Sequence, residues 1–321
     1  MGAVTSAAPQ PPTGALQRPP TADLVLLGVG VLAVSVSAPL IAATAAPALA
    51  IAFWRNAFGT AAIAPFALAT RRAELAGLTR RELGLAALAG LLLALHFGTW
   101  IPSLDYTTVA ASTALVATQP IWAALIAQAT GQRIPGQAWT GIGVALVGVL
   151  VLTGIDVSLD PSALVGDALA LVGAVFAAAY VSVGSRARQT VSTTSYTLLC
   201  YGVCAAVLLV ACLIGGQRLA GYDADTWLKL LALTATAQLL GHSVLNRVLK
   251  RTSPTIVSLG ILFEMPGATL VAAVWLGQVP PWGILPAAGL ILAGLVIVVR
   301  SAGRVAPVGA PDGPDPAAPA G

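Results

Sequence analysis

Apolar stretches of roughly 20 residues follow one another along this sequence from Leu24 to Val299. An α-helix of that length spans the hydrocarbon core of a bilayer. Hydrophobic residues make up 57% of the chain and charged residues only 9%, too few to cover a soluble protein of 321 residues. A membrane β-barrel would instead alternate polar and apolar residues. The sequence therefore predicts an all-α polytopic membrane protein.

Clusters of Pro, Gly, Asp and Arg divide the chain into ten apolar segments. Lipid offers no partner to a free backbone amide or carbonyl, so each segment is expected to be a transmembrane helix. Their predicted ranges are 23–44, 47–70, 82–103, 107–130, 136–154, 163–185, 193–214, 226–249, 254–276 and 281–300.

The pattern of the first half recurs 146 residues later in the second half. The chain's two histidines, His96 and His242, are separated by this spacing. Several prolines, glycines and glutamines also recur at it: Pro120 and Pro266, Gly131-Gln132 and Gly277-Gln278, Gly143 and Gly289. A duplicated unit with an odd number of spans gives two halves of opposite orientation around a central site. We therefore expect two inverted five-helix repeats, at residues 23–154 and 163–300.

The distribution of basic residues predicts the orientation. If the amino terminus is cytoplasmic, 13 of the 16 Lys and Arg residues lie in inside segments, which places both termini in the cytoplasm. These residues stand singly or in pairs at the ends of apolar runs, so a nucleic-acid partner is not expected. The tails, residues 1–22 and 301–321, hold few large apolar groups and are expected to be disordered. The predicted location is the cytoplasmic membrane, with the lipid bilayer as partner.

Four ionisable residues fall inside predicted spans. At mid-bilayer such a group costs on the order of 2.5 to 3.5 kcal/mol, so it needs a partner or a water-filled cavity. We take them as candidates for binding a small-molecule substrate or a coupling proton: Arg55, His96, His242 and Glu264. Two alternatives stay open. Each histidine could be neutral and hydrogen-bonded between packed helices, and Arg55 could reach the outer interface or pair with an acid.

Further candidates lie near these four. Trp100 follows His96 by four residues, on the same helical face, and Asn246 follows His242 in the same way. Pro120 and Pro266 each remove an intrahelical hydrogen bond, which predicts a kink or local opening in spans four and nine. Other polar candidates for the central chamber are Gln119 and Tyr180.

No cofactor or metal is expected. The three cysteines have no nearby histidine or acid that would complete a metal site, and they are interpreted as small buried thiols: Cys200, Cys204 and Cys212. The sequence contains no P-loop, nucleophile elbow or zinc motif, which argues against an ATP-driven pump and against a protease of known signature. Small residues dominate spans five and ten, which are expected to pack closely or to form a homodimer contact.

Several stretches resemble the EamA domain of the drug/metabolite transporter superfamily. They are Ala117 to Trp122, Gly131-Gln132-Arg133, Trp139 to Leu152, the step Phe53-Trp54-Arg55, and the stretch from Glu264 through Pro266 to Gly277. The likeness covers about residues 23–300 and includes both copies. It implies a ten-helix carrier of two inverted repeats that moves amino acids, other metabolites or toxic compounds, often outward.

One departure from that family concerns the ends of spans four and nine. The family commonly has Gly-Glu there, whereas this chain has Gly131-Gln132 and Gly277-Gln278. Any anchoring or coupling role of those two carboxylates does not carry over, so the loops must be held in another way.

The favoured function is a secondary transporter in which the two repeats rock around a central cavity. Glu264, His96 or His242 could bind a proton on one face of the membrane and release it on the other. The alternative is a membrane-embedded enzyme or flippase that uses the two histidines on a lipid-borne substrate. A passive channel is a third hypothesis, although nothing resembles a selectivity filter.

Overall fold

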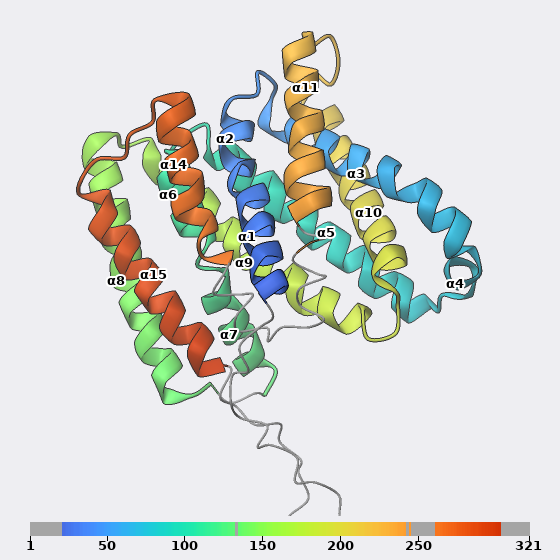
Figure 1. The fold of residues 1–321 in the computed structure, drawn as a ribbon, viewed down its shortest axis with the longest axis horizontal. Helices are drawn as coiled ribbons and strands as arrows, with labels where there is room; N and C mark the ends of the chain where they lie inside the picture. Colours follow the sequence, from blue (N-terminus) through green and yellow to red (C-terminus); the bar gives the residue numbers. More distant parts are fainter. Residues whose placement is uncertain (1–20, 132–133, 242–243, 245–260, 303–321) are drawn as a thin grey trace, which may run out of the picture.

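The computed structural model describes residues 21–131, 134–241, 244 and 261–302, and over these residues it contains helices and no strand (Figure 1). The helices are α1 Thr21–Ser35, α2 Ser37–Ala42, α3 Ala48–Thr70, α4 Arg72–Gly77, α5 Arg80–Ser103, α6 Val109–Val116, α7 Gln119–Ala129, α8 Gly136–Leu159, α9 Ala163–Ala187, α10 Thr193–Ile214, α11 Ala224–Leu233, the π-helix η1 Thr234–Gly241, α14 Glu264–Leu276 and α15 Ile284–Ala302.

Seven of the ten predicted spans are described as helices long and apolar enough to cross a membrane: residues 21–42, 80–103, 109–129, 136–155, 163–187, 193–214 and 284–301. The other three are helical but do not meet that description. Their helices are α3, which carries Arg55 and Asn56, the pair α11 and η1, and the short apolar α14. The structure thus shows a multi-pass helical membrane protein, and the count of ten crossings stays a prediction.

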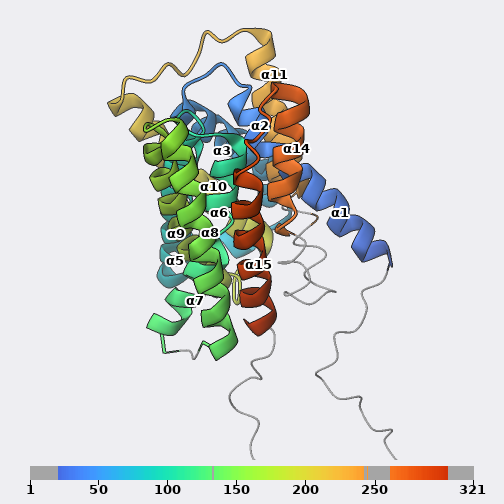
Figure 2. The same ribbon diagram turned by 90° about the vertical axis from the view of Figure 1, so that its left-hand side faces the viewer.

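The predicted ends of several segments shift by a few residues. α1 begins at Thr21 and α15 ends at Ala302, so two residues of each predicted tail are helical, and α8 continues to Leu159. The remaining parts of both tails lie outside the described residues. Figure 2 shows the start of α1 and the end of α15 directed toward the same end of the bundle. An even number of crossings would produce this arrangement.

Short polar signals set the starts of several helices. Thr79 and Glu82 form a reciprocal capping box at the start of α5. The side chains of Thr108, Ser192 and Asp223 cap α6, α10 and α11 by accepting hydrogen bonds from backbone amides. These caps satisfy amide groups that a helix end would otherwise leave without partners.

Helix contacts follow the internal repeat. Spans at equivalent positions of the two halves pack against each other: α3 packs against α10, α8 packs against α15, and spans four and nine meet through α6 and α14. In the first half α5 packs against α9, and the equivalent contact in the second half is that of η1 with α1. Span four, through α6 and α7, also packs against α9, and the equivalent contact of span nine is that of α14 with α1. This symmetric pairing is the pattern expected of two inverted repeats.

Glycines let α8 and α15 approach closely. A Cβ on Gly141 would lie 2.6 Å from the Gly294 carbonyl oxygen, one on Gly148 2.8 Å from that of Ala287, and one on Gly294 2.5 Å from that of Gly141. Added Cβ atoms on Gly143 and Gly289 would meet nothing within 4 Å. The predicted close packing of spans five and ten is therefore present, and their other faces remain the place for any homodimer contact.

Spans four and nine are interrupted at equivalent places. α6 ends at Val116 and α7 begins at Gln119, with Pro120 as its second residue. A turn at Leu262 and Phe263 precedes α14, where Pro266 is the third residue. The prolines therefore lie in the first turn of a new helix, where a missing N–H costs little. The expected opening lies just before each proline rather than at it.

The glycine of each repeated Gly-Gln pair lies at the end of a helix. Gly131 and Gly277 adopt positive φ of 91° and 67°, and Gly277 ends α14, a conformation that glycine adopts without steric cost. Next to it, the Gln278 side-chain oxygen accepts a hydrogen bond of 3.2 Å from the Val109 amide at the start of α6. An amide side chain thus holds this loop without a carboxylate. Gln132 lies outside the described residues.

Gly294→Ala is expected to destabilise the protein by about 1–3 kcal/mol, because its methyl group would collide with the backbone of α8. Gly289→Ala on the same helix is the matched control, and it should be neutral or slightly stabilising. Thermal unfolding of the purified proteins in detergent measures both. Equal melting temperatures for the two variants would contradict the α8–α15 contact.

Gln278→Glu is expected to stabilise the protein by about 0.3–1 kcal/mol, because a carboxylate at the amino terminus of α6 interacts favourably with the helix dipole. Gln217→Glu adds the same charge to the α10–α11 loop, where Gln217 donates to the Gly215 carbonyl instead. Denaturation midpoints compare the two. A gain no larger than that of the Gln217 control would argue against the helix-end contact.

Candidate functional site

Arg55 is buried in the interior of the helix bundle, so it does not reach the outer interface. Its side chain is 2% exposed and lies on α3. Nε donates a hydrogen bond of 2.9 Å to the Gln238 side-chain oxygen. The guanidinium carbon lies 4.2 Å from the ring centre of Phe97 on α5, a cation–π contact. The charge is thus held by one amide and one aromatic face.

Gln238 connects this arginine to a second polar side chain. Its Nε2 donates to the Asn56 Oδ1 at 3.1 Å, and Asn56 Nδ2 donates to the Ala52 carbonyl at 2.9 Å. Gln238 and Asn56 are 2% and 0% exposed. Because α3 belongs to the first half and η1 to the second, this network joins the two halves inside the bundle.

The local backbone suits this network. Gln238 lies in the π-helix η1, a helix form found often at functional sites. Gly59, one turn after Arg55 on α3, leaves room for it, since a Cβ there would lie 3.1 Å from Gln238 Nε2 and 3.3 Å from the Tyr201 ring. Neither feature is visible in the apolar pattern of the sequence.

Two buried donors in this region have no hydrogen-bond partner among the described residues. They are Nη1 of Arg55 and Nε1 of Trp100, and Trp100 is 5% exposed. Both side chains border Phe97, whose ring centre lies 6.4 Å from that of Trp100. Buried polar groups in proteins are nearly always hydrogen-bonded, so such exceptions point to a function or to an absent ligand.

Glu264 is the first residue of α14 and is partly buried. It lies close enough for its charge to act on Arg55, yet in the described part of the chain no ion pair joins the two. A carboxylate in the first turn of a helix is favoured by the helix dipole. The amino terminus of α14 therefore stabilises the Glu264 carboxylate, which forms no ion pair with Arg55.

His96 packs between helices. Its Nδ1 lies 2.9 Å from the Gly173 carbonyl on α9, to which it donates. Its ring is stacked on Trp100, with centres 5.6 Å apart and planes 9° apart. This is the arrangement expected from the packing alternative for a histidine inside a membrane. It also places Trp100 firmly beside Phe97.

The remaining predicted residues do not join the hydrogen-bond network of Arg55, Gln238 and Asn56, and two of them are not described. Tyr180 on α9 packs against the core cluster that includes Tyr196 and Cys200. Gln119 begins α7 and is partly buried. His242 and Asn246 lie outside the described residues. Within the described ranges, no group of three His, Cys, Asp or Glu residues could hold a metal ion.

Sequence reasoning missed Gln238, Asn56 and Phe97. Asn56 follows Arg55 directly, and Gln238 precedes His242 by four residues in an otherwise apolar stretch. Both are polar residues inside predicted spans, which is the signal that could have found them. Phe97 carried no such signal, because an aromatic residue in an apolar helix is ordinary core.

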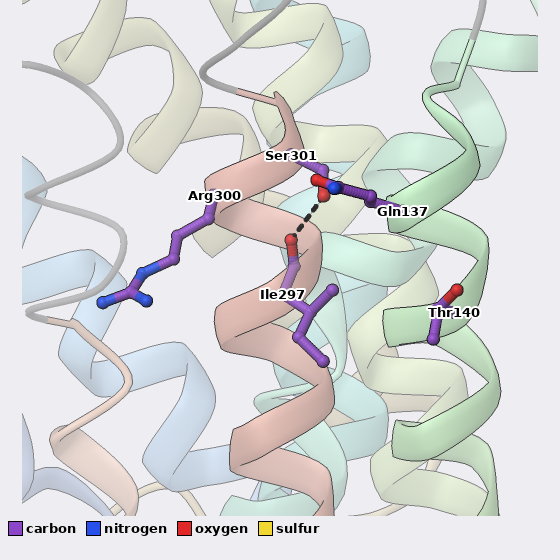
Figure 3. Close-up of a pocket in the computed structure, with 5 residues that line it drawn as sticks. All are labelled: Gln137, Thr140, Ile297, Arg300 and Ser301. Atoms are coloured by element: carbon purple, nitrogen blue, oxygen red, sulfur yellow. Dashed lines mark hydrogen bonds between the residues drawn. The ribbon is translucent and has the colours of Figure 1, made fainter. Parts of the chain in front are cut away.

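A hollow of about 340 Å³ lies between α8 and α15, lined by Gln137, Thr140, Ile297, Arg300 and Ser301 (Figure 3). The Ser301 hydroxyl donates to the Ile297 carbonyl at 2.7 Å within α15. None of the buried polar network lies on these two helices. We therefore place the candidate site at Arg55 and not in this hollow.

Comparison with known proteins gives a family match and a fold match. The sequence model of the EamA-like transporter family matches residues 21–154 and 164–300. A solved crystal structure, described only as that of a protein, has a TM-score of 0.60 and 20% identity and covers 89% of this chain and 99% of its own. That likeness supports the fold. No curated protein matches the chain.

Gln238→Leu is expected to destabilise the protein by about 1–3 kcal/mol, because Arg55 Nε and Asn56 Oδ1 would both lose their partners. Thr236→Ala in the same π-helix is the control, since the Thr236 hydroxyl donates locally to the Ala232 carbonyl at the end of α11. Chemical or thermal unfolding in detergent compares them. If Gln238→Leu were as stable as Thr236→Ala, the network would not link the halves.

Proposed function

Because the chain belongs to the EamA-like transporter family, we propose that it is a secondary active transporter that exports small metabolites, amino acids or drug-like compounds across the cytoplasmic membrane. Transport proceeds by alternating access, in which the two repeats rock around a shared site. Both termini lie in the cytoplasm, as the distribution of arginines favours.

The observation that carries this proposal is Arg55. A cation inside the membrane is expensive and is kept where a substrate or an ion passes. Arg55 is bonded to Gln238 of the other half and still has a donor nitrogen without a partner among the described residues. A group that joins both repeats and retains binding capacity is suited to sense a solute and to couple its binding to their movement.

Contacts between the halves at the two ends of the bundle are the candidate gates. At the end predicted to face outward, Lys229 Nζ donates to the Ala43 carbonyl at 3.0 Å and the Trp54 indole donates to the Leu219 carbonyl at 2.9 Å. At the opposite end, the Glu74 carboxylate accepts a 2.7 Å hydrogen bond from the Ser192 amide. Both sets are formed in this structure, and alternating access requires that only one set be open at a time.

The interrupted helices supply places for such movement. The break before Gln119 separates the short helices α6 and α7, a turn at Leu262 and Phe263 precedes α14, and η1 is a π-helix at Gln238. Hinges are usually a few residues at element ends. We place the bending of each repeat at these breaks, one in each half.

Coupling to protons is assigned to Glu264, with His96 and His242 as further candidates. Glu264 lies at one of the breaks and is not paired with Arg55, so it is free to take up and release a proton as its surroundings change. Export then uses the inward flow of protons. No ATP site is required.

Glu264→Gln is expected to abolish the response of solute flux to a pH gradient, because glutamine cannot carry a proton. Growth protection and export profiling of cells that overproduce the protein, against a metabolite panel, first supply the solute. Flux in proteoliposomes, with and without the gradient, then gives the measurement. Asp160→Asn is the matched control, since this exposed carboxylate accepts a local hydrogen bond from the Ser162 amide and lies outside the proposed gates.

A proton role for Glu264 would be wrong if the variant kept the full response to the gradient. Flux that never saturates with solute concentration, in the wild type, would instead indicate a channel. Chemical change of the added solute would indicate an enzyme.

A further inference from the structure

Two buried donors beside Phe97, Nη1 of Arg55 and Nε1 of Trp100, have no hydrogen-bond partner among the described residues. We propose that Arg55 and Trp100 bind the carboxylate of the transported solute, with Arg55 as the charged anchor and the Trp100 indole as a second donor. This assignment rests on the proposed transport function and names the class of its substrate: small organic carboxylates with an apolar body.

Arg55 forms no ion pair with a described residue, although the carboxylate of Glu264 lies near enough for its charge to act on the guanidinium. Its direct contacts are the Gln238 amide oxygen and the Phe97 ring, both uncharged. Tyr201 and Cys204 of α10 are near it and are neutral as phenol and thiol. Burying a cation without an anion is costly, and an anionic ligand would recover that cost on binding.

The geometry of a guanidinium favours a carboxylate. Its planar set of N–H groups matches two carboxylate oxygens, and charge-assisted bonds of this kind are stronger than those between neutral groups. In Arg55, Nε is engaged by Gln238 while Nη1 is unused. The hydrogen bond to Gln238 thus holds the side chain in place and leaves a terminal nitrogen for the ligand.

Trp100 adds a donor where none is needed for packing. Its ring is held by the stacked His96 and by α9, where a Cβ on Gly173 would lie 3.0 Å from the Trp100 Cβ. Trp100 is 5% exposed, and its indole N–H has no hydrogen-bond partner among the described residues. An anion beside Phe97 would satisfy it.

The surroundings suggest the rest of the solute. Phe97 is 6% exposed and Tyr201 is 8% exposed, and both belong to the same core cluster as Trp100. These buried aromatic surroundings favour a solute with an aliphatic or aromatic body attached to the carboxylate and few further polar groups. A multiply charged phosphate ester would have to bury more charge than Arg55 can balance.

Paired probes separate charge from shape. The test uses the full-length purified protein and three matched pairs: benzoate with benzamide, 3-phenylpropionate with 3-phenylpropionamide, and hexanoate with hexanamide. Thermal unfolding in detergent measures binding, since a ligand that binds the folded state raises the melting temperature. Proteoliposome flux of the same compounds measures transport. Carboxylates are expected to raise the melting temperature and to give saturable flux, and their amides are not.

Two variants test the residues. Trp100→Phe removes the indole donor and one buried ring, and it should weaken carboxylate binding about tenfold; the melting temperature of the ligand-free variant measures the packing loss separately. Arg55→Met should remove the carboxylate response altogether. Trp139→Phe on α8, where the side chain is 46% exposed, is the control and should behave as wild type.

The outcomes distinguish this inference from the proposed function. It is overturned if carboxylates and amides shift the melting temperature alike, if neither shifts it, or if Trp100→Phe binds carboxylates as tightly as wild type. Should carboxylates bind but none be carried across the vesicle membrane, the anion site stands and the transport function fails. Should only neutral amides be carried, transport stands and the anion site fails.

Discussion

The absence of water from the hydrocarbon core is the constraint on which the rest of this structure depends. Every polar group there must find its partner within the protein. The hydroxyl groups of the spans do so locally, as Ser35, Thr60 and Thr113 each donate to a carbonyl four residues earlier in their own helix. Arg55, Gln238 and Asn56 differ from these hydroxyl groups, because their buried side chains bond one another between the two halves of the protein.

Close helix packing and polar linkage have different roles in the two parts of the bundle. α8 and α15 meet through glycines, backbone against backbone, which gives a tight and apolar contact. The contact of α3 with η1 instead depends on Arg55, Gln238 and Asn56. An apolar seam can stay fixed through a transport cycle, whereas a network of a few bonds can be rearranged by a solute that competes for one of its donors.

Part of the candidate site could be predicted from the sequence. The cost of an ionisable group inside a membrane singled out Arg55, and helical spacing placed Trp100 beside His96. The spacing could not reveal that His96 would bond the Gly173 carbonyl, because Gly173 lies 77 residues away. For the same reason Phe97 and Gln238 were not foreseen as the groups that hold Arg55. Tyr180, chosen as a candidate, packs with Tyr196 and Cys200.

Apolar runs of membrane-spanning length, the spacing of 146 residues and the one-sided arginines were enough to predict a helical membrane protein of two related halves. These properties follow from the thickness of the bilayer and from helix geometry, which act along the chain. Only the tertiary structure decided which helices pair, where spans four and nine break, and which groups surround Arg55. Those depend on contacts between residues far apart in sequence, where the fit of side chains selects one arrangement.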